Sequence, residues 1–297
     1  MKQKTIGVIA VLFAALMWAI EPVITKLSYA DSGFIQTSMI RAFVISIFTA
    51  LLLVITKRPV IVKDKRTITS LGYIALMGTL VADLIYYYAM GTIPVVNAVL
   101  LGHLQPVFII LIGFFILRTD SLKPYDYLGV TLLMISAVLV TTRTIDRAVQ
   151  LNFGTIGDAL VLLATITWAT TAIATRKYLT HLDAVVITFY RFFLASIFFV
   201  FMIPFVNLTV NIYQIIVGFV VAFGTIGYYA GLRKLKAAQV SGLELAAPVF
   251  AAIIGYLVLG EYVTILQVVG MIILFLGIYC ISKKETEGLK VTTVKDT

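Results

Sequence analysis

Six ionisable side chains lie inside long apolar stretches of this sequence, where a charged group is rare and costly. They are Glu21, Arg41, Asp83, His103, Arg191 and Glu244. A charge at the centre of a membrane-spanning helix costs ~2.5–3.5 kcal/mol on insertion scales, so such residues usually face a partner or a water-filled cavity. Carboxylates, arginines and an imidazole at these positions can bind a polar solute, carry a proton or form a fixed ion-pair network.

The first group of these residues contains Glu21, Arg41 and Asp83. Two carboxylates that share one arginine cannot both remain charged cheaply in a medium of low dielectric constant. One of them could therefore hold a proton and carry it across the membrane. A fixed structural network of the three residues is the alternative, and the sequence leaves both interpretations open.

The second group contains Arg191 and Glu244, which we expect to neutralise each other as an ion pair. His103 precedes Pro106 by three residues. Because a proline inside a helix removes a hydrogen bond and kinks the helix, we expect the imidazole to bind a freed carbonyl or a nearby carboxylate. The other histidine, His181, lies in a predicted loop, so we expect no zinc site and no cofactor.

Aromatic and hydroxyl side chains share helix faces with these charged residues. Trp18 and Glu21 lie on one such face, and Trp168 and Thr171 lie on another. Indole and phenol rings offer flat faces to aromatic or cationic ligands. We expect these faces to line one cavity. The residues predicted to line it or to take part in coupling are Trp18, Glu21, Arg41, Asp83, Tyr87, His103, Trp168, Thr171, Arg191, Tyr228 and Glu244.

The composition identifies the elements that position these side chains. Of the 297 residues, 61% are hydrophobic and 12% are charged, and the mean hydropathy is +1.05. Soluble domains have ~45–50% apolar and ~25% charged residues. These values exclude a soluble enzyme, a nucleic-acid-binding protein and a disordered chain. The expected environment is the lipid bilayer.

Ten apolar stretches are long enough to be membrane spans, which need ~20 residues each. Because lipid cannot satisfy free backbone groups and no alternating strands are seen, we expect an all-α membrane protein of ten helices. The first stretch is predicted to be an uncleaved span, since its apolar run is long and contains Glu21. The ten predicted spans are 6–28, 34–56, 68–90, 94–117, 125–142, 154–175, 184–206, 212–232, 237–260 and 264–282.

The distribution of lysine and arginine predicts the orientation. The chain has 23 of these residues, and the loops on the N-terminal side of the membrane hold most of them. Only Lys26, Arg143 and Arg147 fall on the other side. Positive charge accumulates on the cytoplasmic side of membrane proteins. We therefore expect a multi-pass protein of the plasma membrane with both termini in the cytoplasm and a flexible tail at 285–297.

The two halves of the chain resemble each other. Trp18 and Arg41 recur as Trp168 and Arg191, 150 residues later, and Pro106 recurs as Pro248, 142 residues later. Each half has five predicted spans, so the second half enters the membrane from the opposite side. Residues 1–146 and 147–284 are thus predicted to form an inverted repeat, an arrangement that permits alternating access. An old duplication without functional symmetry is the alternative.

These features resemble the drug/metabolite transporter superfamily, EamA type, over residues 6–282. Two motifs carry the resemblance besides the tryptophan and the arginines: Ala246-Ala247-Pro248-Val249-Phe250 and Leu259-Gly260-Glu261. The resemblance implies a secondary transporter with a central cavity between its halves, often an exporter of metabolites or amino acids. The first half departs from the pattern, with His103-Leu104-Gln105-Pro106 and Arg118-Thr119-Asp120 at the matching positions.

The predicted function is export of a small organic metabolite across the cytoplasmic membrane by alternating access. Protons are a candidate coupling ion, and nucleic acid is not an expected partner. A membrane-embedded enzyme that uses intramembrane carboxylates, or a channel, is the alternative, although the chain lacks HExxH, GxSxG and Walker motifs. Small-residue stripes at Gly129, Ser136, Gly270 and Gly277 suit internal helix packing or a homodimer.

Alternating access also predicts two sites of closure. Glu21, Arg41 and Asp83 are expected near the outer face, whereas Thr171, Arg191 and Thr225 are expected near the inner face. The two groups should close in turn about one central site.

Overall fold

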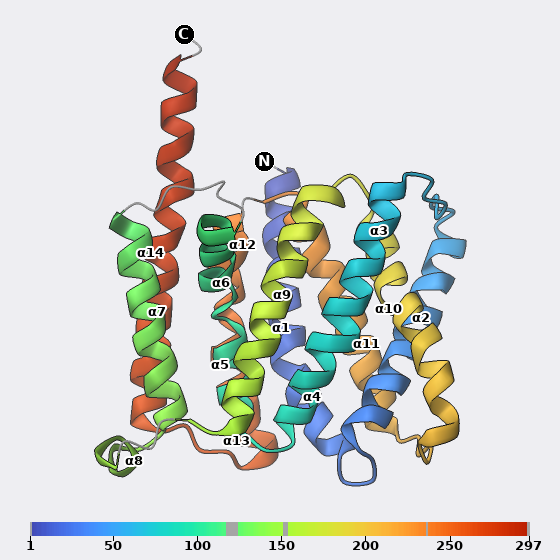
Figure 1. The fold of residues 1–297 in the computed structure, drawn as a ribbon, viewed down its shortest axis with the longest axis horizontal. Coiled ribbons are helices and arrows are strands. Elements are labelled where there is room, and N and C mark those ends of the chain that lie inside the picture. Colours follow the sequence, from blue (N-terminus) through green and yellow to red (C-terminus); the bar gives the residue numbers. More distant parts are fainter. Residues whose placement is uncertain (1, 117–123, 151–153, 236, 296–297) are drawn as a thin grey trace.

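The structure is a computed structural model that describes residues 2–116, 124–150, 154–235 and 237–295. All the secondary structure within these ranges is helical. The long helices run roughly side by side, and both ends of the chain lie at the same end of the bundle (Figure 1). We call this the terminal end and the other the far end.

The first half of the chain contains helices of very different lengths. They are α1 (Lys2–Ser28), α2 (Phe34–Ile55), α3 (Lys65–Tyr73), the π-helix η1 (Ile74–Asp83), α4 (Leu84–Met90), α5 (Val95–Gly102), α6 (Gln105–Leu111), the π-helix η2 (Ile112–Ile116), α7 (Pro124–Thr142) and α8 (Ile145–Val149). Elements α3, η1 and α4 follow one another without a break.

The second half contains longer helices and one interruption. They are α9 (Ile156–Tyr178), α10 (Ala184–Met202), the 3₁₀ turn η3 (Ile203–Phe205), α11 (Ile212–Leu232), α12 (Ala237–Glu244), α13 (Ala246–Leu259) and α14 (Ile265–Lys295). Helix α14 continues through 285–295, where the sequence predicts a flexible tail.

Seven helical stretches of the described residues are long and apolar enough to cross a membrane. They are Lys4–Ser28, Phe34–Ile55, Lys65–Met90, Ile156–Tyr178, Ala184–Phe205, Ile212–Leu232 and Gly242–Leu259. Three shorter apolar helices occupy the places of the fourth, fifth and tenth predicted spans: Val95–Leu111, Tyr127–Thr142 and Ile265–Cys280. The helical fold class is confirmed, and each predicted stretch overlaps an apolar helix, although among the described residues only seven of these helices are long enough to cross a membrane.

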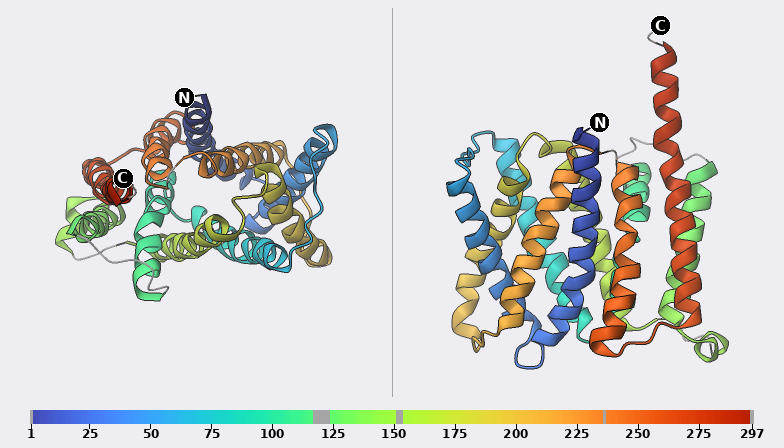
Figure 2. Two further views of the ribbon diagram at one scale, coloured as in Figure 1. Left: turned by 90° about the horizontal axis from the view of Figure 1, so that it is seen from above. Right: turned by 180° about the vertical axis from the view of Figure 1, so that it is seen from behind.

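Large apolar side chains cover the outside of the bundle. Ile47, Val54, Phe201 and Leu257 are more than two-thirds exposed, whereas many hydroxyl side chains of the helices are buried. This arrangement is the reverse of a water-soluble core and suits a surface in contact with lipid. Figure 2 shows that the bundle is elongated, with α7 and α14 at one side and α2 and α10 towards the other.

Two helices are interrupted in the middle of the bundle. Helix α5 ends at Gly102 and α6 begins at Gln105, with Pro106 in its first turn. Helix α12 ends at Glu244, and α13 begins at Ala246. A proline in the first turn of a helix leaves no donor unsatisfied, whereas in a continuous helix it would clash with the preceding turn. The kink predicted near Pro106 is therefore present as a full break.

Polar caps fix where two of the helices begin. Asp64 accepts a hydrogen bond from the Thr67 backbone N–H at the start of α3, and this bond and that of the Thr67 hydroxyl hold the pKa of Asp64 below its usual range. Thr155 and Asp158 form a capping box at the start of α9. Asp158 also accepts from Asn97 of α5 at 2.8 Å. Asp158 therefore lies in the first turn of α9 and joins it to α5.

Small residues bring α7 and α14 into close contact. Ser136 Oγ donates to the Gly270 carbonyl at 2.7 Å. A Cβ atom added at Gly270 would lie 2.8 Å from Val140, and one at Gly277 would lie 2.7 Å from Leu133. The small-residue stripes are thus used for packing within the chain, which removes this face as the basis for a homodimer.

Candidate functional site

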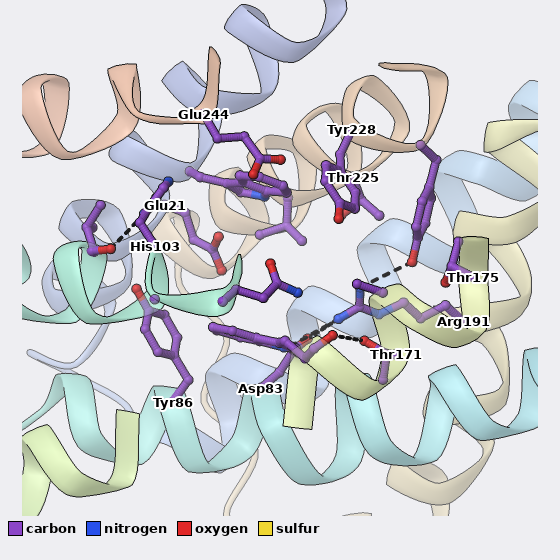
Figure 3. Close-up of a pocket in the computed structure, with 18 of the residues that line it drawn as sticks. Glu21, Asp83, Tyr86, His103, Thr171, Thr175, Arg191, Thr225, Tyr228 and Glu244 are labelled. Atoms are coloured by element: carbon purple, nitrogen blue, oxygen red, sulfur yellow. Dashed lines mark hydrogen bonds and ion pairs between the residues drawn. The ribbon is translucent and has the colours of Figure 1, made fainter. Parts of the chain in front are cut away.

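A cavity of about 150 Å³ lies inside the bundle (Figure 3). Its walls come from helices of both halves of the chain and include the two helix breaks. Ten of the eleven residues that the sequence predicts for the site line it: Trp18, Glu21, Arg41, Asp83, His103, Trp168, Thr171, Arg191, Tyr228 and Glu244. The eleventh, Tyr87, lies behind this layer and contacts Glu21.

Asp83 is the centre of a buried polar network. Its carboxylate accepts from Arg41 Nη2 at 2.9 Å and from Arg191 Nη2 at 3.1 Å. Trp168 Nε1 donates to the same carboxylate at 2.8 Å. Asp83 is only 4% exposed. Since hydrogen bonds from charged donors are stronger than neutral ones, these contacts stabilise its negative charge away from water.

Arg41 links Asp83 to Glu21. The distance from Arg41 Nη1 to Glu21 Oε1 is 3.6 Å, and Tyr87 Oη donates to the same oxygen at 2.7 Å. The guanidinium carbon of Arg41 lies 4.2 Å from the centre of the Tyr87 ring. This aromatic face supplies a favourable environment for a cation that is 1% exposed.

The π-helix η1 presents three groups to Arg191. Arg191 Nε donates to Thr79 Oγ1 at 3.0 Å, and Nη2 donates to the Gly78 carbonyl at 3.3 Å as well as to Asp83. In a π-helix, residues five apart lie one turn apart, so Gly78 and Asp83 face the same side. A Cβ atom at Gly78 would lie 3.3 Å from the guanidinium, so glycine permits this close approach.

Two aromatic pairs stand at opposite walls of the cavity. The ring centres of Trp18 and Tyr228 are 5.1 Å apart, and those of Tyr86 and Trp168 are 5.0 Å apart. Each pair joins a tryptophan of one half to a tyrosine of the other. Such tilted contacts are favourable for aromatic rings. They fix the orientation of the rings that line the cavity.

Glu244 lies at the end of α12 and contributes its carboxylate to the cavity (Figure 3). The residue is 9% exposed. Its Oε1 atom is buried without a hydrogen-bond partner among the described residues. Within the same part of the chain, no ion pair reaches this carboxylate. It therefore differs from Asp83, which has three donors.

His103 occupies the break between α5 and α6. Its Nδ1 lies 2.7 Å from the Val99 carbonyl, one turn earlier in α5. The imidazole thus bonds a backbone carbonyl, but the Val99 carbonyl also accepts from the His103 backbone N–H, so it is not the freed carbonyl that was predicted. The acceptor is a carbonyl within α5, and it is not the carbonyl four residues before Pro106.

Polar contacts join several elements at the far end of the bundle. Lys26 Nζ lies 2.6 Å from Glu261 Oε1, and Glu261 Oε2 accepts from the Val95 backbone N–H at 2.7 Å. These contacts tie the end of α1 to the start of α5 and to the residues after α13. The cavity lining, in contrast, reaches Thr175, one turn before the end of α9 at the terminal end.

Comparison with known proteins identifies the family. The sequence model of the EamA-like transporter family matches residues 5–142 and 155–283. The chain belongs to the EamA-like transporter family. The resemblance inferred from the sequence is thereby confirmed, and with the apolar helices it makes this chain a multi-pass membrane protein of a transporter family.

Individual relatives agree with this assignment. An uncharacterized transporter of Methanothermobacter thermautotrophicus is 26% identical over 69% of this chain, and one of Synechocystis is 26% identical over 68%; each match spans 62% of the relative's length. One of Clostridium kluyveri is 23% identical over 96% of both chains. A crystal structure with 16% identity has a TM-score of 0.65 and covers 92% of this chain and 95% of its own, so it shares the fold.

Two expectations about charge pairing in this EamA-like chain are wrong. Arg191 does not pair with Glu244; it binds Asp83. Arg41 is consequently not the only cation near Glu21 and Asp83. The sequence predicted an outer group (Glu21, Arg41 and Asp83) and an inner group (Thr171, Arg191 and Thr225). In the structure both groups line one cavity, because the Arg191 side chain extends across to η1.

Several residues outside the eleven predicted for the site lie on the same polar helix faces and also line the cavity. Tyr86 rather than Tyr87 lines the cavity, and Tyr229 and Thr175 line it too. The π-helix η1 explains why Tyr86 and not Tyr87 faces the cavity. A π-helix has more residues per turn than an α-helix, so the residues of α4 that follow it are rotated about the helix axis. The sequence feature that points to Tyr86 is its equivalence to Tyr228, a predicted site residue that follows 142 residues later.

Proposed function

We propose that this protein is a secondary transporter that moves a small organic metabolite out of the cell by alternating access. The observation that carries the proposal is an internal cavity with walls from both halves of the chain, lined by charged, aromatic and hydroxyl side chains. Such a cavity at the breaks of interrupted helices is the usual form of a transporter's substrate site.

Equivalent residues of the two halves support an inverted repeat of ten spans. Trp18 and Trp168 are equivalent, as are Tyr86 and Tyr228, and each tryptophan contacts the tyrosine of the other half. Ser46 and Ser196 are 150 residues apart, like the two tryptophans, and their hydroxyls lie 3.0 Å apart. Equivalent atoms that contact each other lie on or beside a pseudo-two-fold axis.

The position of the cavity supports a state that is open towards the terminal end. Its lining reaches Thr175 near that end, whereas Lys26, Glu261 and Val95 join the elements at the far end. The charge distribution of the sequence assigns the terminal end to the cytoplasm. The substrate would then enter from the cytoplasm, as export requires.

We also propose that transport is coupled to protons. Of the two carboxylates considered as proton carriers, Glu21 and Asp83, the geometry favours Glu21. Asp83 accepts from two arginines and an indole, so protonation would break several contacts. Glu21 has one phenol donor and an arginine at 3.6 Å. Glu21 is therefore the better candidate for a group that gains and loses a proton during transport.

Counterflow in proteoliposomes tests the transport function. Purified protein should exchange a labelled solute for the same unlabelled solute, with saturable kinetics, and a pH gradient should change the accumulation. Chemical conversion of the solute without exchange would favour an embedded enzyme. Flux that does not saturate would favour a channel.

A further inference from the structure

We propose that the cavity binds a small organic cation and that Glu244 binds its ammonium group, an inference that rests on the proposed transport function. The other charges in the cavity balance, because Arg41 and Arg191 face Glu21 and Asp83. Glu244 adds a third carboxylate to these two cations and two anions, so the cavity has one negative charge in excess whenever Glu244 is ionised. A ligand with one positive charge restores neutrality.

The hydrogen bonds of Glu244 also call for a donor. Its Oε1 is buried and unpartnered within the described part of the chain. A buried polar atom without a partner is costly, and more so when it carries charge. The N–H groups of a primary or secondary ammonium supply the donor that the protein does not.

The surroundings of Glu244 suit an ammonium with an apolar body. Tyr228 borders the same side of the cavity as Glu244 in Figure 3, and its ring contacts Trp18. Aromatic faces attract cations, most strongly away from water. The equivalent position in the first half is Gly102, which lines the cavity without a side chain. The free carboxylate is therefore on one side only, and the ammonium is oriented towards α12.

The size of the cavity limits the ligand. Its volume is about 150 Å³. A buried cavity of ~150 Å³ is large enough to hold benzene. Ligands of the predicted class are thus monoamines with a short alkyl or single-ring body.

Tryptophan fluorescence offers a direct test, because the chain has two tryptophans and both line the cavity. The purified protein in detergent is titrated at neutral pH with three probes of similar size: 2-phenylethylammonium, 2-phenylethanol and 3-phenylpropionate. The expected result is a saturable change with the ammonium at a concentration at least tenfold lower than with the alcohol or the carboxylate. Equal or tighter binding of either of these, or no saturable change with the ammonium, would overturn the proposal.

Variants then locate the binding group. Glu244→Gln should weaken ammonium binding at least tenfold, Glu244→Asp should retain most of it, and Asp146→Asn, on the exposed helix α8, should leave it unchanged. Unchanged binding by a monodisperse Glu244→Gln protein would refute the assignment. If that variant does not fold, the three probes on the unaltered protein still decide whether the cavity selects a cation.

The two proposals fail in different ways. Saturable counterflow of another solute, without ammonium binding, would keep the transport function and reject the cation site. Ammonium binding that depends on Glu244, without movement of any solute, would keep the site and reject transport.

Discussion

Asp83 is the residue whose negative charge Arg41 and Arg191 share. Asp83→Asn keeps the shape and an acceptor for Trp168 but leaves two buried guanidinium groups short of one negative charge. Removing one partner of a buried ion pair costs ~3–5 kcal/mol. We expect a clear fall in the thermal unfolding temperature of the detergent-purified protein. Asp146→Asn on the surface is the control, and equal stability of the two variants would show that Asp83 is not the centre of the network.

Glu21 carries a different prediction. Glu21→Gln still offers an oxygen to the Tyr87 hydroxyl, so the fold should survive. If Glu21 carries the coupled proton, the variant should retain solute exchange in counterflow but lose accumulation driven by a pH gradient. Exchange does not require release of the proton, whereas uphill movement does. Full accumulation by Glu21→Gln would mean that this carboxylate is structural.

At the level of single residues, the sequence predicted which side chains are buried in the cavity better than which of them pair. Costly charges in apolar stretches indicated Glu21, Arg41, Asp83, Arg191 and Glu244, because each must avoid lipid. Pairing depends on how the helices pack and how far each side chain reaches. The bond from Arg191 to Asp83 joins residues 108 positions apart and crosses the assumed boundary between inner and outer groups.

At the level of elements, the π-helix η1 gives a prediction about Gly78. A Cβ atom there would lie 3.3 Å from the Arg191 guanidinium, closer than packed atoms normally allow. Gly78→Ala should displace Arg191 from Asp83 and reduce the rate of counterflow severalfold. Gly72→Ala, in the preceding helix α3, is the matched control because nothing lies within 4 Å of its added carbon.

The control should be neutral or more stable by up to ~1 kcal/mol, since alanine is the better helix former. Thermal unfolding and counterflow of both variants separate the two effects. Identical transport by both would show that the close approach at Gly78 does not matter.

Hydropathy predicted where the helices lie, because ~20 apolar residues are needed to span a bilayer. It could not predict their internal irregularities. The π-turns of η1 depend on the fit between neighbouring helices, whereas the breaks before Pro106 and Pro248 have a local cause that the sequence shows. These irregularities place Asp83 and His103 in the cavity, so the functional positions are the ones that regular helices predict least well.

At the level of the whole molecule, the matches between the halves predict a symmetric arrangement, but the acidic residues differ at equivalent positions. Glu244 is equivalent to Gly102, and Asp83 is equivalent to Thr225. Glu21 is equivalent to Thr171, so the first half supplies two acidic groups that the second half lacks, and the second half supplies one. Arg41 and Arg191 balance the two acids of the first half, and Glu244 is left for a ligand. A duplicated fold can thus bind an asymmetric solute in a defined orientation.

Alternating access makes a prediction about the two ends of the bundle. Cys280→Ser removes the single native cysteine, and cysteines can then replace Thr25 or Thr175. Thr25 is fully buried near the far end, and Thr175 lines the cavity near the terminal end. Thr79 is unsuitable for this substitution because its hydroxyl accepts a bond from Arg191. In the state described here, a water-soluble thiol reagent should label the cysteine at 175 from the terminal side and leave that at 25 unlabelled.

Loosening the far end should reverse this pattern. Glu261→Gln removes the charge that holds Lys26 and weakens the contact with Val95, and we expect both contacts only while the far end is closed. If one half rocks against the other, labelling at position 25 from the far side should rise severalfold while labelling at 175 falls. Arg233→Gln, which removes an exposed ion pair with Asp183 at the terminal end, should not raise labelling at 25. A rise at both positions together would indicate a continuous pore, and unchanged rates at both would mean that the Lys26–Glu261 contact does not govern closure.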